Sequence, residues 1–239
     1  MWNASLVAAL AVFNDEQYNV VLNRLHSDIH PCASVFIVAF SSEERFPVNS
    51  LRNLAMSAVK TDNLINLDVD IIPFAQGHTL ETPINTVTIL PAFELHNLLP
   101  VPITKEEVIF MFRQEQLVRF KNHCFNCHGM TNFEQWFSAN EYYEVDHKSE
   151  NAEPYFVISA GHAPRFDERF CYGYRNRVSN VYEIAQKFGF RVHPHAWLLH
   201  LPHDNPPFND RLSFGCPGVS KPRLDRLWNQ FKKDLSENK

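Results

Sequence analysis

Apolar and polar positions alternate along this chain in a way that predicts strands and helices in succession. Short apolar runs bounded by polar residues or proline are typical of buried strands, and an apolar residue at every third or fourth position is typical of a helix. The pattern predicts strands over residues 6–13, 34–40, 64–67, 86–90, 155–158 and 192–201. It predicts helices over residues 16–25, 47–60, 105–120, 175–188 and 224–235.

This order of elements indicates an α/β fold with a mostly parallel sheet flanked by helices. In such sheets, ligands bind beyond the carboxyl ends of the strands. Asp68 and Asp70 follow the predicted strand over 64–67, and His200 lies near the end of the strand over 192–201. We therefore expect these side chains at one edge of the sheet. The chain shows no internal repeat or linker, so the sequence predicts a single domain over residues 1–239.

Composition narrows the class of protein. The net charge of −5 leaves no basic field that would attract a nucleic-acid backbone, so nucleic acid is not an expected partner. No apolar run approaches the roughly 20 residues that a membrane-spanning helix needs. The run over residues 6–13 has the length of a signal-peptide core, but no Lys or Arg precedes it, so we interpret it as a strand.

Asp68 and Asp70 are the main candidates for metal binding. Two carboxylates one residue apart supply the oxygen ligands that Mg²⁺ and Mn²⁺ prefer, and an imidazole from His200 would favour Mn²⁺. The chain has only seven glycines and no glycine-rich phosphate loop, so a metal bridge is the natural way for it to hold a diphosphate. The alternative is a solvated loop with two aspartates, together with an ordinary histidine at position 200.

Asp167 and Glu168 are candidates for a general base, because they stand just before a predicted helix and a base must reach the proton it removes. The alternative is a salt-bridged helix entry in which one carboxylate pairs with Arg165 or Arg169. Arg52, on the helix before the aspartate pair, could hold a diphosphate or a sugar carboxylate through two parallel hydrogen bonds. An exposed helical arginine with no ligand is the other interpretation of Arg52.

The segment His123-Cys124-Phe125-Asn126-Cys127-His128 contains the Cys-x-x-Cys-His pattern of covalent haem attachment and resembles half of a zinc site. A second ligand pair at zinc-site spacing is missing. The remaining alternatives are a disulfide and free thiols. With five cysteines in the chain, at least one thiol stays unpaired or bonds to another chain.

A series of short segments then ties the chain to a known family. They are Trp2, Phe46-Pro47-Val48-Asn49-Ser50-Leu51-Arg52-Asn53-Leu54-Ala55, Leu67-Asp68-Val69-Asp70-Ile71-Ile72-Pro73, Pro91-Ala92-Phe93-Glu94, His128-Gly129-Met130-Thr131-Asn132-Phe133-Glu134-Gln135-Trp136, Glu153-Pro154-Tyr155-Phe156-Val157, Phe166-Asp167-Glu168-Arg169-Phe170, Tyr172-Gly173-Tyr174-Arg175-Asn176-Arg177-Val178-Ser179 and His200-Leu201-Pro202-His203. In this order, over nearly the whole chain, they resemble the LARGE-type and beta-1,4-glucuronyltransferase family of glycosyltransferases, glycosyltransferase family 49.

The resemblance implies a nucleotide-sugar-binding α/β fold of the GT-A type. It implies an Mn²⁺-dependent, inverting hexosyl transfer from a UDP-sugar, with UDP-glucuronate as the typical donor and Mg²⁺ as the alternative ion. The acceptor would be a glycan or glycoprotein hydroxyl, often on a xylose. Asp70 would ligate the metal, Asp68 would contact the metal or the ribose, and His200 would be the third ligand, with His203 the less favoured choice.

The same resemblance assigns the other roles. Asp167 would be the base, with Glu168 in reserve. On the donor side would lie Asn49, Arg52, Arg175, Asn176 and Arg177; on the acceptor side would lie His128, Thr131 and Asn132.

Relatives of this type are usually held in the Golgi lumen by an N-terminal membrane helix and stem, and this chain shows neither. The sequence after the aspartate pair also departs from the family pattern, which leaves the identity of the donor open. The competing hypothesis from a different class is a catalytically inactive relative that binds a glycan or a nucleotide-sugar.

Overall fold

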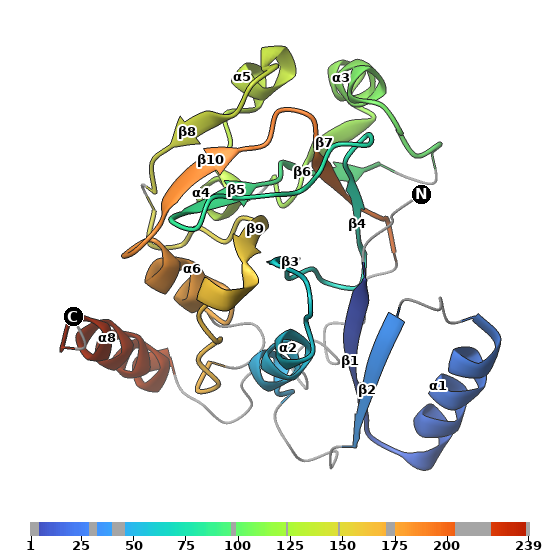
Figure 1. Ribbon diagram of the computed structural model, residues 1–239, viewed down its shortest axis with the longest axis vertical. Helices are drawn as coiled ribbons and strands as arrows, with labels where there is room; N and C mark the ends of the chain where they lie inside the picture. The colour runs from blue at the N-terminus through green and yellow to red at the C-terminus, as the bar shows by residue number, and fades with distance from the viewer. Residues whose placement is uncertain are drawn as a thin grey trace. The chain divides into compact units, whose positions relative to one another are not determined.

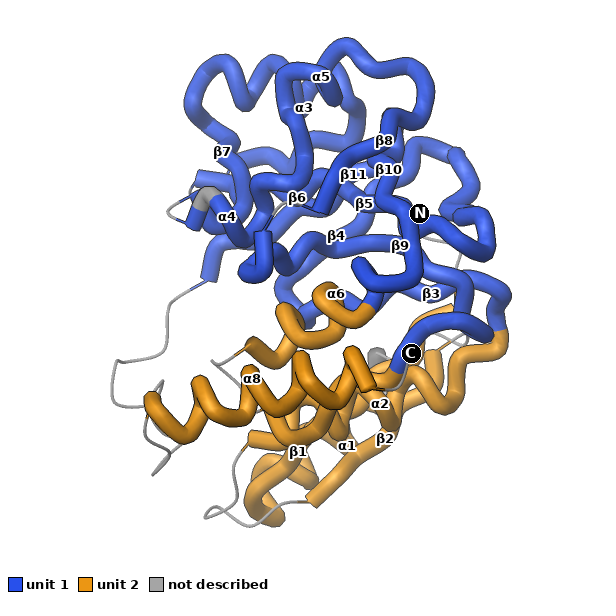
Figure 2. The backbone as a smooth tube through the Cα atoms, turned by 90° about the vertical axis from the view of Figure 1, so that its left-hand side faces the viewer, with its two compact units in different colours: residues 1–2, 61–164, 184–205 blue, residues 3–60, 165–183, 206–239 orange. Residues whose placement is uncertain are grey.

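The computed structural model describes residues 5–28, 33–39, 46–96, 99–122, 124–147, 149–170, 175–203 and 221–237. These ranges contain both helices and strands, in part alternating along the chain, which confirms the predicted α/β class and is consistent with a GT-A-like fold. The chain forms two compact units, coloured separately in Figure 2. Unit 1 contains residues 61–164 and 184–205, and unit 2 contains residues 3–60, 165–183 and 206–239. The prediction of one domain over 1–239 stays a prediction.

Unit 2 is built on a pair of parallel strands, β1 (Leu6–Val12) and β2 (Ala33–Ala39), joined by helix α1 (Asp15–Asp28). Parallel neighbours need such a crossover because the chain must return to the same end of the sheet. Helix α2 (Val48–Ser57) packs on β1, and Figure 1 draws α1 and α2 to the two sides of the strand pair. The strands are rich in valine, alanine and other apolar residues, most of which are half-buried.

Two further helices of unit 2 share an aromatic core. They are α6 (Val178–Ile184), most of which belongs to this unit, and α8 (Lys221–Glu237). Trp228 and Phe231 of α8 are buried with Phe170, and the Phe170 and Phe231 ring centroids are 5.3 Å apart. Tyr182 of α6 meets Trp228 at 5.1 Å. The helix predicted over residues 224–235 thus lies within α8, and its apolar Trp228 and Phe231 are buried.

The described residues of unit 1 form two sheets. The first has the order β3-β9-β5-β10-β8, with β3 (Asn63–Ile65), β9 (Phe156–Ser159), β5 (Thr86–Ile89), β10 (Gly189–Val192) and β8 (Tyr143–Val145). The second has the order β4-β11-β6-β7, with β4 (Ile71–Phe74), β11 (Trp197–His200), β6 (Ala92–Leu95) and β7 (Leu117–Arg119). In these two sheets the β10–β5 and β11–β6 pairs are parallel, and the other described pairs are antiparallel.

Short helices complete unit 1: α3 (Lys105–Arg113), α4 (Phe125–His128), α5 (Phe133–Ser138) and the 3₁₀ turn η1 (Ala160–His162). Helices α3 and α5 lie at the same end of the unit in both views (Figures 1 and 2). The core beneath them holds Phe93, Trp136 and Trp197 at full burial. Lys105 is buried as well, and its ammonium donates to the carbonyl oxygens of Ala139 and Pro194, at 2.7 Å and 2.9 Å.

Most predicted elements differ from the observed ones by a few residues at their ends, and three predictions fail by more than that. The helix predicted over 105–120 is wrong beyond Arg113, because Glu115 takes a φ of 56° and the chain turns into β7. Leu117 is therefore buried as a strand residue opposite Leu95. The strand predicted over 192–201 is limited to β11, because a turn that starts at His193 separates β11 from the end of β10 at Val192. The helix predicted over 175–188 is limited to α6.

In the part of the chain that the structure describes, no helix combines the length and apolarity needed to cross a bilayer. Trp2, His123 and the segment Tyr172-Gly173-Tyr174, which helped to carry the resemblance or the cysteine pattern, lie outside the described residues, as do Cys32, Cys171 and Cys216.

His193 organises the turn between β10 and β11. Its Nδ1 accepts hydrogen bonds from the backbone N–H groups of His195 and Ala196, at 3.0 Å and 2.9 Å, so this nitrogen must be unprotonated. Burial lowers the pKa of His193 from 6.5 to about 4, and the positive charges of His78, His195 and Arg191 add to the shift.

We expect His193 to make folding sensitive to acid. The unfolded chain binds the proton near pH 6.5 and the folded chain only near pH 4, so the free energy of unfolding falls by about 3 kcal/mol as the pH drops through this window. In His193→Asn, the amide oxygen can accept the same backbone hydrogen bonds and does not titrate, so this part of the pH dependence should disappear. Denaturant unfolding of both proteins between pH 4 and 7 measures it. The exposed His162→Asn is the control and should keep the wild-type slope.

Candidate metal centre

Asp70 and His200 are brought together by the antiparallel pairing of β4 with β11. His200, the last residue of β11, is the register partner of Ile71, the first residue of β4. The backbone N–H of Leu201 donates to the carbonyl oxygen of Asp70 at 3.0 Å, which extends the ladder by one step. Asp70 and His200 were expected at one edge of a sheet, and they meet there. The predicted geometry was wrong in one respect, because β4 begins after the aspartate pair and runs antiparallel to β11.

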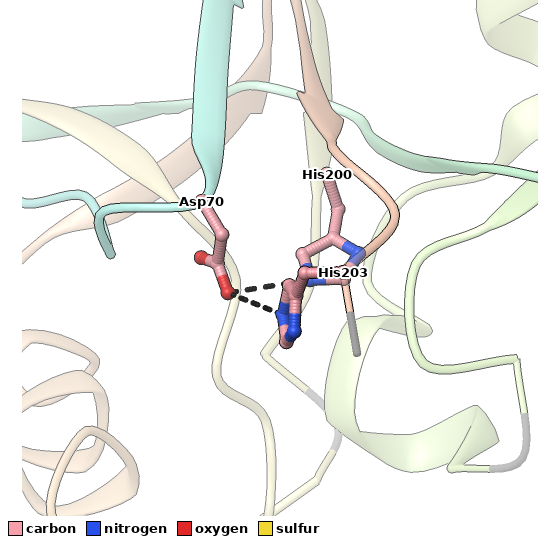
Figure 3. A group of neighbouring side chains, drawn as sticks. All are labelled: Asp70, His200 and His203. Atoms are coloured by element: carbon pink, nitrogen blue, oxygen red, sulfur yellow. Dashed lines mark hydrogen bonds and ion pairs between the residues drawn. The ribbon is translucent and has the colours of Figure 1, made fainter. Parts of the chain in front are cut away.

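Three side chains converge at this edge, as Figure 3 shows: Asp70, His200 and His203. Oδ2 of Asp70 lies 3.3 Å from Nε2 of His200 and 3.1 Å from Nε2 of His203. One ligand atom from each residue lies within 4.8 Å of the other two. One carboxylate and two imidazoles at this spacing are a donor set that fits a divalent metal ion. His203, the less favoured choice from the sequence, lies as close to Asp70 as His200 does.

The exposure of the three side chains suits a site that holds an ion and still admits a ligand. The side chain of His200 is 13% exposed, that of Asp70 is 31% exposed and that of His203 is 45% exposed. The site is therefore closed on the His200 side and open on the His203 side. A metal ion bound by a few protein ligands with open positions can take oxygen atoms from a substrate.

Asp68 lies beside this group without belonging to it. Its Oδ2 accepts a hydrogen bond of 2.8 Å from the hydroxyl of Tyr155. Between the two aspartates, Val69 is 99% exposed, so the Asp68–Asp70 segment projects into solvent. The sequence reasoning missed Tyr155 as a partner of Asp68, because nothing in the spacing of residues 68 and 155 indicates contact. Its only signal was its place in the segment Glu153-Pro154-Tyr155-Phe156-Val157.

An aromatic wall packs behind the histidines. The Phe120 ring centroid lies 4.9 Å from that of His200 and 5.0 Å from that of His128. His128 in turn stacks on Tyr155 at 5.8 Å. Cys124 and Cys127, which flank the start of α4, form a disulfide. The disulfide resolves the alternatives for the Cys-x-x-Cys-His pattern, because sulfurs bonded to each other are not thiolate ligands for zinc and cannot link to haem.

The predicted acceptor-side residues follow this wall in the chain. His128 and Thr131 are buried. Asn132 is exposed and caps α5, where its Oδ1 accepts from the backbone N–H of Gln135 at 3.1 Å. Their role toward an acceptor stays a prediction.

The other predicted site residues belong to unit 2. Helix α2 carries two of them, Asn49 and Arg52. Asn49 is buried, and its amide nitrogen donates to the carbonyl oxygens of Asp167 and Asn176, at 2.8 Å and 3.0 Å. Asn53 is buried too. Its side chain hydrogen-bonds to both the backbone N–H and the carbonyl oxygen of Phe166. The sequence assigned no role to Asn53, which stood only within the segment over residues 46–55. In the structure, Asn53 is the residue that joins α2 to the segment carrying the candidate bases.

Asp167 and Glu168 are both engaged by neighbours. Arg169 donates to both carboxylate oxygens of Asp167, with a shortest distance of 2.6 Å, as the salt-bridge alternative predicted. Glu168 accepts from Asn53 at 2.7 Å and from Ser50 at 2.8 Å. These hydrogen bonds, that of Asn53 first, lower the pKa of Glu168, which makes it a weaker base.

Several arginines of unit 2 that were predicted to bind the donor already contact other side chains. Arg52 donates to Oδ1 of Asn49 at 3.0 Å, and its guanidinium lies 5.2 Å from the Phe166 ring centroid. Arg175 has a φ of 46° and its guanidinium lies 4.4 Å from the ring centroid of Trp228. Arg177 is buried, and its backbone N–H donates to the side chain of Asn176. Donor binding by these residues stays a prediction.

Comparison with known proteins decides the family. A family model described as "Glycosyl-transferase for dystroglycan" matches residues 25–203, which is well over half of the chain. The chain belongs to this glycosyltransferase family. It is 30% identical over 211 residues to the xylosyl- and glucuronyltransferase LARGE1 of Mus musculus, an alignment that covers 83% of this chain and 27% of that protein.

Other relatives agree. The identity is 31% over 214 residues to the xylosyl- and glucuronyltransferase LARGE2s of Gallus gallus, covering 83% of this chain and 28% of that protein. The identity to LARGE1 of Homo sapiens is 30% over 211 residues, an alignment that covers 83% of this chain and 27% of that protein. The chain thus spans less than a third of the length of these relatives. The family predicted from the sequence is confirmed.

We expect Asn53 to be a major contributor to the stability of unit 2. Asn53→Ala leaves the buried backbone N–H and carbonyl of Phe166 without their side-chain partner, so the free energy of unfolding should fall by about 3 kcal/mol. Ser50→Ala is the control, because it removes only an exposed hydrogen bond to Glu168 and should change stability by less than about 1 kcal/mol. Equal effects of the two substitutions, measured by chemical denaturation, would contradict this role of Asn53.

Proposed function

We propose that this chain is the catalytic part of a metal-dependent, inverting glycosyltransferase that moves a sugar from a UDP-sugar to a hydroxyl of a glycan or glycoprotein. The observation that carries the proposal is the convergence of Asp70, His200 and His203 at the β4–β11 edge, in a chain whose family consists of glycosyltransferases. For the donor we propose UDP-glucuronate, with UDP-xylose second, because the relatives are named xylosyl- and glucuronyltransferases.

Asp70, His200 and His203 would hold the ion, for which we propose Mn²⁺ because two of the three ligands are imidazoles. When bound, the ion supplies Lewis-acid neutralisation of the leaving diphosphate. Asp68, whose carboxylate is oriented by the Tyr155 hydroxyl, is proposed to contact the ion or the ribose of the donor. A UDP-sugar, a divalent metal and a glycan acceptor are therefore the expected partners.

Asp167 is our proposed base. The acceptor hydroxyl oxygen would form a bond to the anomeric carbon while the bond from that carbon to the UDP oxygen breaks, and Asp167 would take the hydroxyl proton. Glu168 is the weaker choice because Asn53 and Ser50 hold it in its charged form. For Asp167 to act, its ion pair with Arg169 must open or rearrange as the substrates bind.

The partly exposed Arg52 and Arg175 are better placed to meet a sugar carboxylate than the buried Asn49 and Arg177, for which we propose a supporting role in the donor site. For cellular location we propose the Golgi lumen. The Cys124–Cys127 disulfide supports this proposal, because disulfides persist in oxidising compartments.

A second candidate function is a binding relative without turnover. It is favoured by one observation: both carboxylates of the candidate base pair are engaged, Asp167 by Arg169 and Glu168 by Asn53 and Ser50. Such a protein would bind UDP-sugar and metal and release no UDP with any acceptor.

The metal requirement can be tested by UDP release. We expect release from UDP-glucuronate with a xyloside acceptor in Mn²⁺ and none in EDTA. Asp70→Asn should lower the rate at least about 100-fold, because the diphosphate charge is then poorly neutralised. The exposed Asp62→Asn in the same unit is the matched control and should behave as wild type. Full Mn²⁺-dependent activity in Asp70→Asn would refute the site, whereas release from another donor would change only the substrate.

The base can be identified by comparing two conservative substitutions. Asp167→Asn should lower kcat by about 100- to 10,000-fold with little change in UDP binding, since the loss falls on proton transfer. Glu168→Gln should change kcat much less. The opposite ranking would assign the base to Glu168, and UDP binding without turnover in the wild type would support the second candidate function.

A further inference from the structure

The two nitrogens of the His200 ring face different carboxylates. Nε2 faces Oδ2 of Asp70 at 3.3 Å, and Nδ1 faces Oε1 of Glu94 at 3.8 Å. Nδ1 is shielded from solvent and makes no hydrogen bond within the described residues. Glu94 is the charged group that faces this buried nitrogen, and a movement of about 1 Å would bring it into hydrogen-bonding range.

The strand register holds Glu94 in this position. Glu94 on β6 is the parallel partner of His200 on β11, so the two side chains leave neighbouring strands on the same side of the sheet. On the other edge of β11, Asp70 precedes the first residue of β4, and its carbonyl oxygen accepts from the backbone N–H of Leu201. His200 therefore stands between two carboxylates, and the Phe120 ring at 4.9 Å packs against its imidazole.

We propose that Glu94 is a positioning residue for the metal centre, which accepts a hydrogen bond from Nδ1–H of His200 and directs the Nε2 lone pair toward the ion. The inference rests on the proposed function and deepens it, since it concerns the same site. Neutral histidine carries one proton, and a carboxylate acceptor at Nδ1 keeps that proton away from Nε2. It also holds the ring plane, so that the orientation of the ligand is fixed.

Glu94 could instead bind the ion directly. Its oxygens do not belong to the group whose ligand atoms lie within 4.8 Å of one another, which favours the indirect role. The two roles differ in one measurable respect. A residue that acts through His200 has nothing to act on when His200 is absent, whereas a direct ligand contributes in either background.

The experiment is a double-mutant cycle read by Mn²⁺ binding. Free Mn²⁺ gives an electron paramagnetic resonance signal that is lost on binding, so titration in the presence of UDP gives the dissociation constant without any turnover. The proteins are the wild type, Glu94→Ala, Glu94→Gln, His200→Ala and the double variant Glu94→Ala/His200→Ala. The control is Glu144→Ala, which removes an exposed strand glutamate of the same unit.

We expect Glu94→Ala to weaken Mn²⁺ binding by about 10- to 100-fold. Glu94→Gln should weaken it less, because its amide oxygen still accepts from Nδ1–H. In the His200→Ala background, removal of Glu94 should have no further effect, and Glu144→Ala should bind as wild type. Thermal unfolding in EDTA should be the same for the wild type and Glu94→Gln, which keeps the test valid if the alanine variant folds poorly.

Two results would overturn this inference and leave the proposed function standing. One is unchanged Mn²⁺ affinity in Glu94→Ala. The other is an equal loss with and without His200, which would make Glu94 a direct ligand. If the wild-type protein binds no Mn²⁺ with UDP, the proposed metal centre fails, and this inference fails with it.

Discussion

The antiparallel pairing of β4 with β11 is the constraint on which the candidate site depends. Pairing in this register sets His200 beside the start of β4, and the bond from Leu201 to the carbonyl of Asp70 fixes the residue before that strand. A slip by one residue would turn the His200 side chain to the opposite face of the sheet. Burial of Leu198 and Leu199 and the stacking of Trp197 on Phe74 oppose such a slip, so core packing determines the positions of the polar ligands.

In unit 2, the irregular segment that carries Asp167 and Glu168 is attached to helix α2. A helix normally buries apolar residues, but α2 buries two asparagines, Asn49 and Asn53, along with Leu51. Their amides can donate and accept at once, so they satisfy backbone groups that would otherwise be buried without partners. The segment that carries Asp167 and Glu168 is therefore held without a strand or helix of its own.

The sequence indicated the Asp68–Asp70 pair, His200 and most strands, because residues at strand ends and apolar runs are local features. It could not show that His203 lies as close to Asp70 as His200 does, since the position of His203 depends on how the chain turns after Leu201. The sequence could not predict the contacts of Glu94, Tyr155 and Asn53 for a related reason. Each of these residues contacts a segment that is distant in sequence. The error over residues 105–120 has the same origin, because Leu117 and Phe120 fit a helical repeat but are buried through β7 and its pairing with β6.

The Cys124–Cys127 disulfide has a practical consequence. Helix α4 is four residues long, too short to be stable through its own hydrogen bonds, and it presents His128 to Phe120 and Tyr155. The sulfur–sulfur bond is thus part of what shapes the wall behind the histidines. Reducing agents that are routine in protein purification would alter this wall in a chain of unchanged sequence. Preparations can be compared with one another only when their thiol content has been measured.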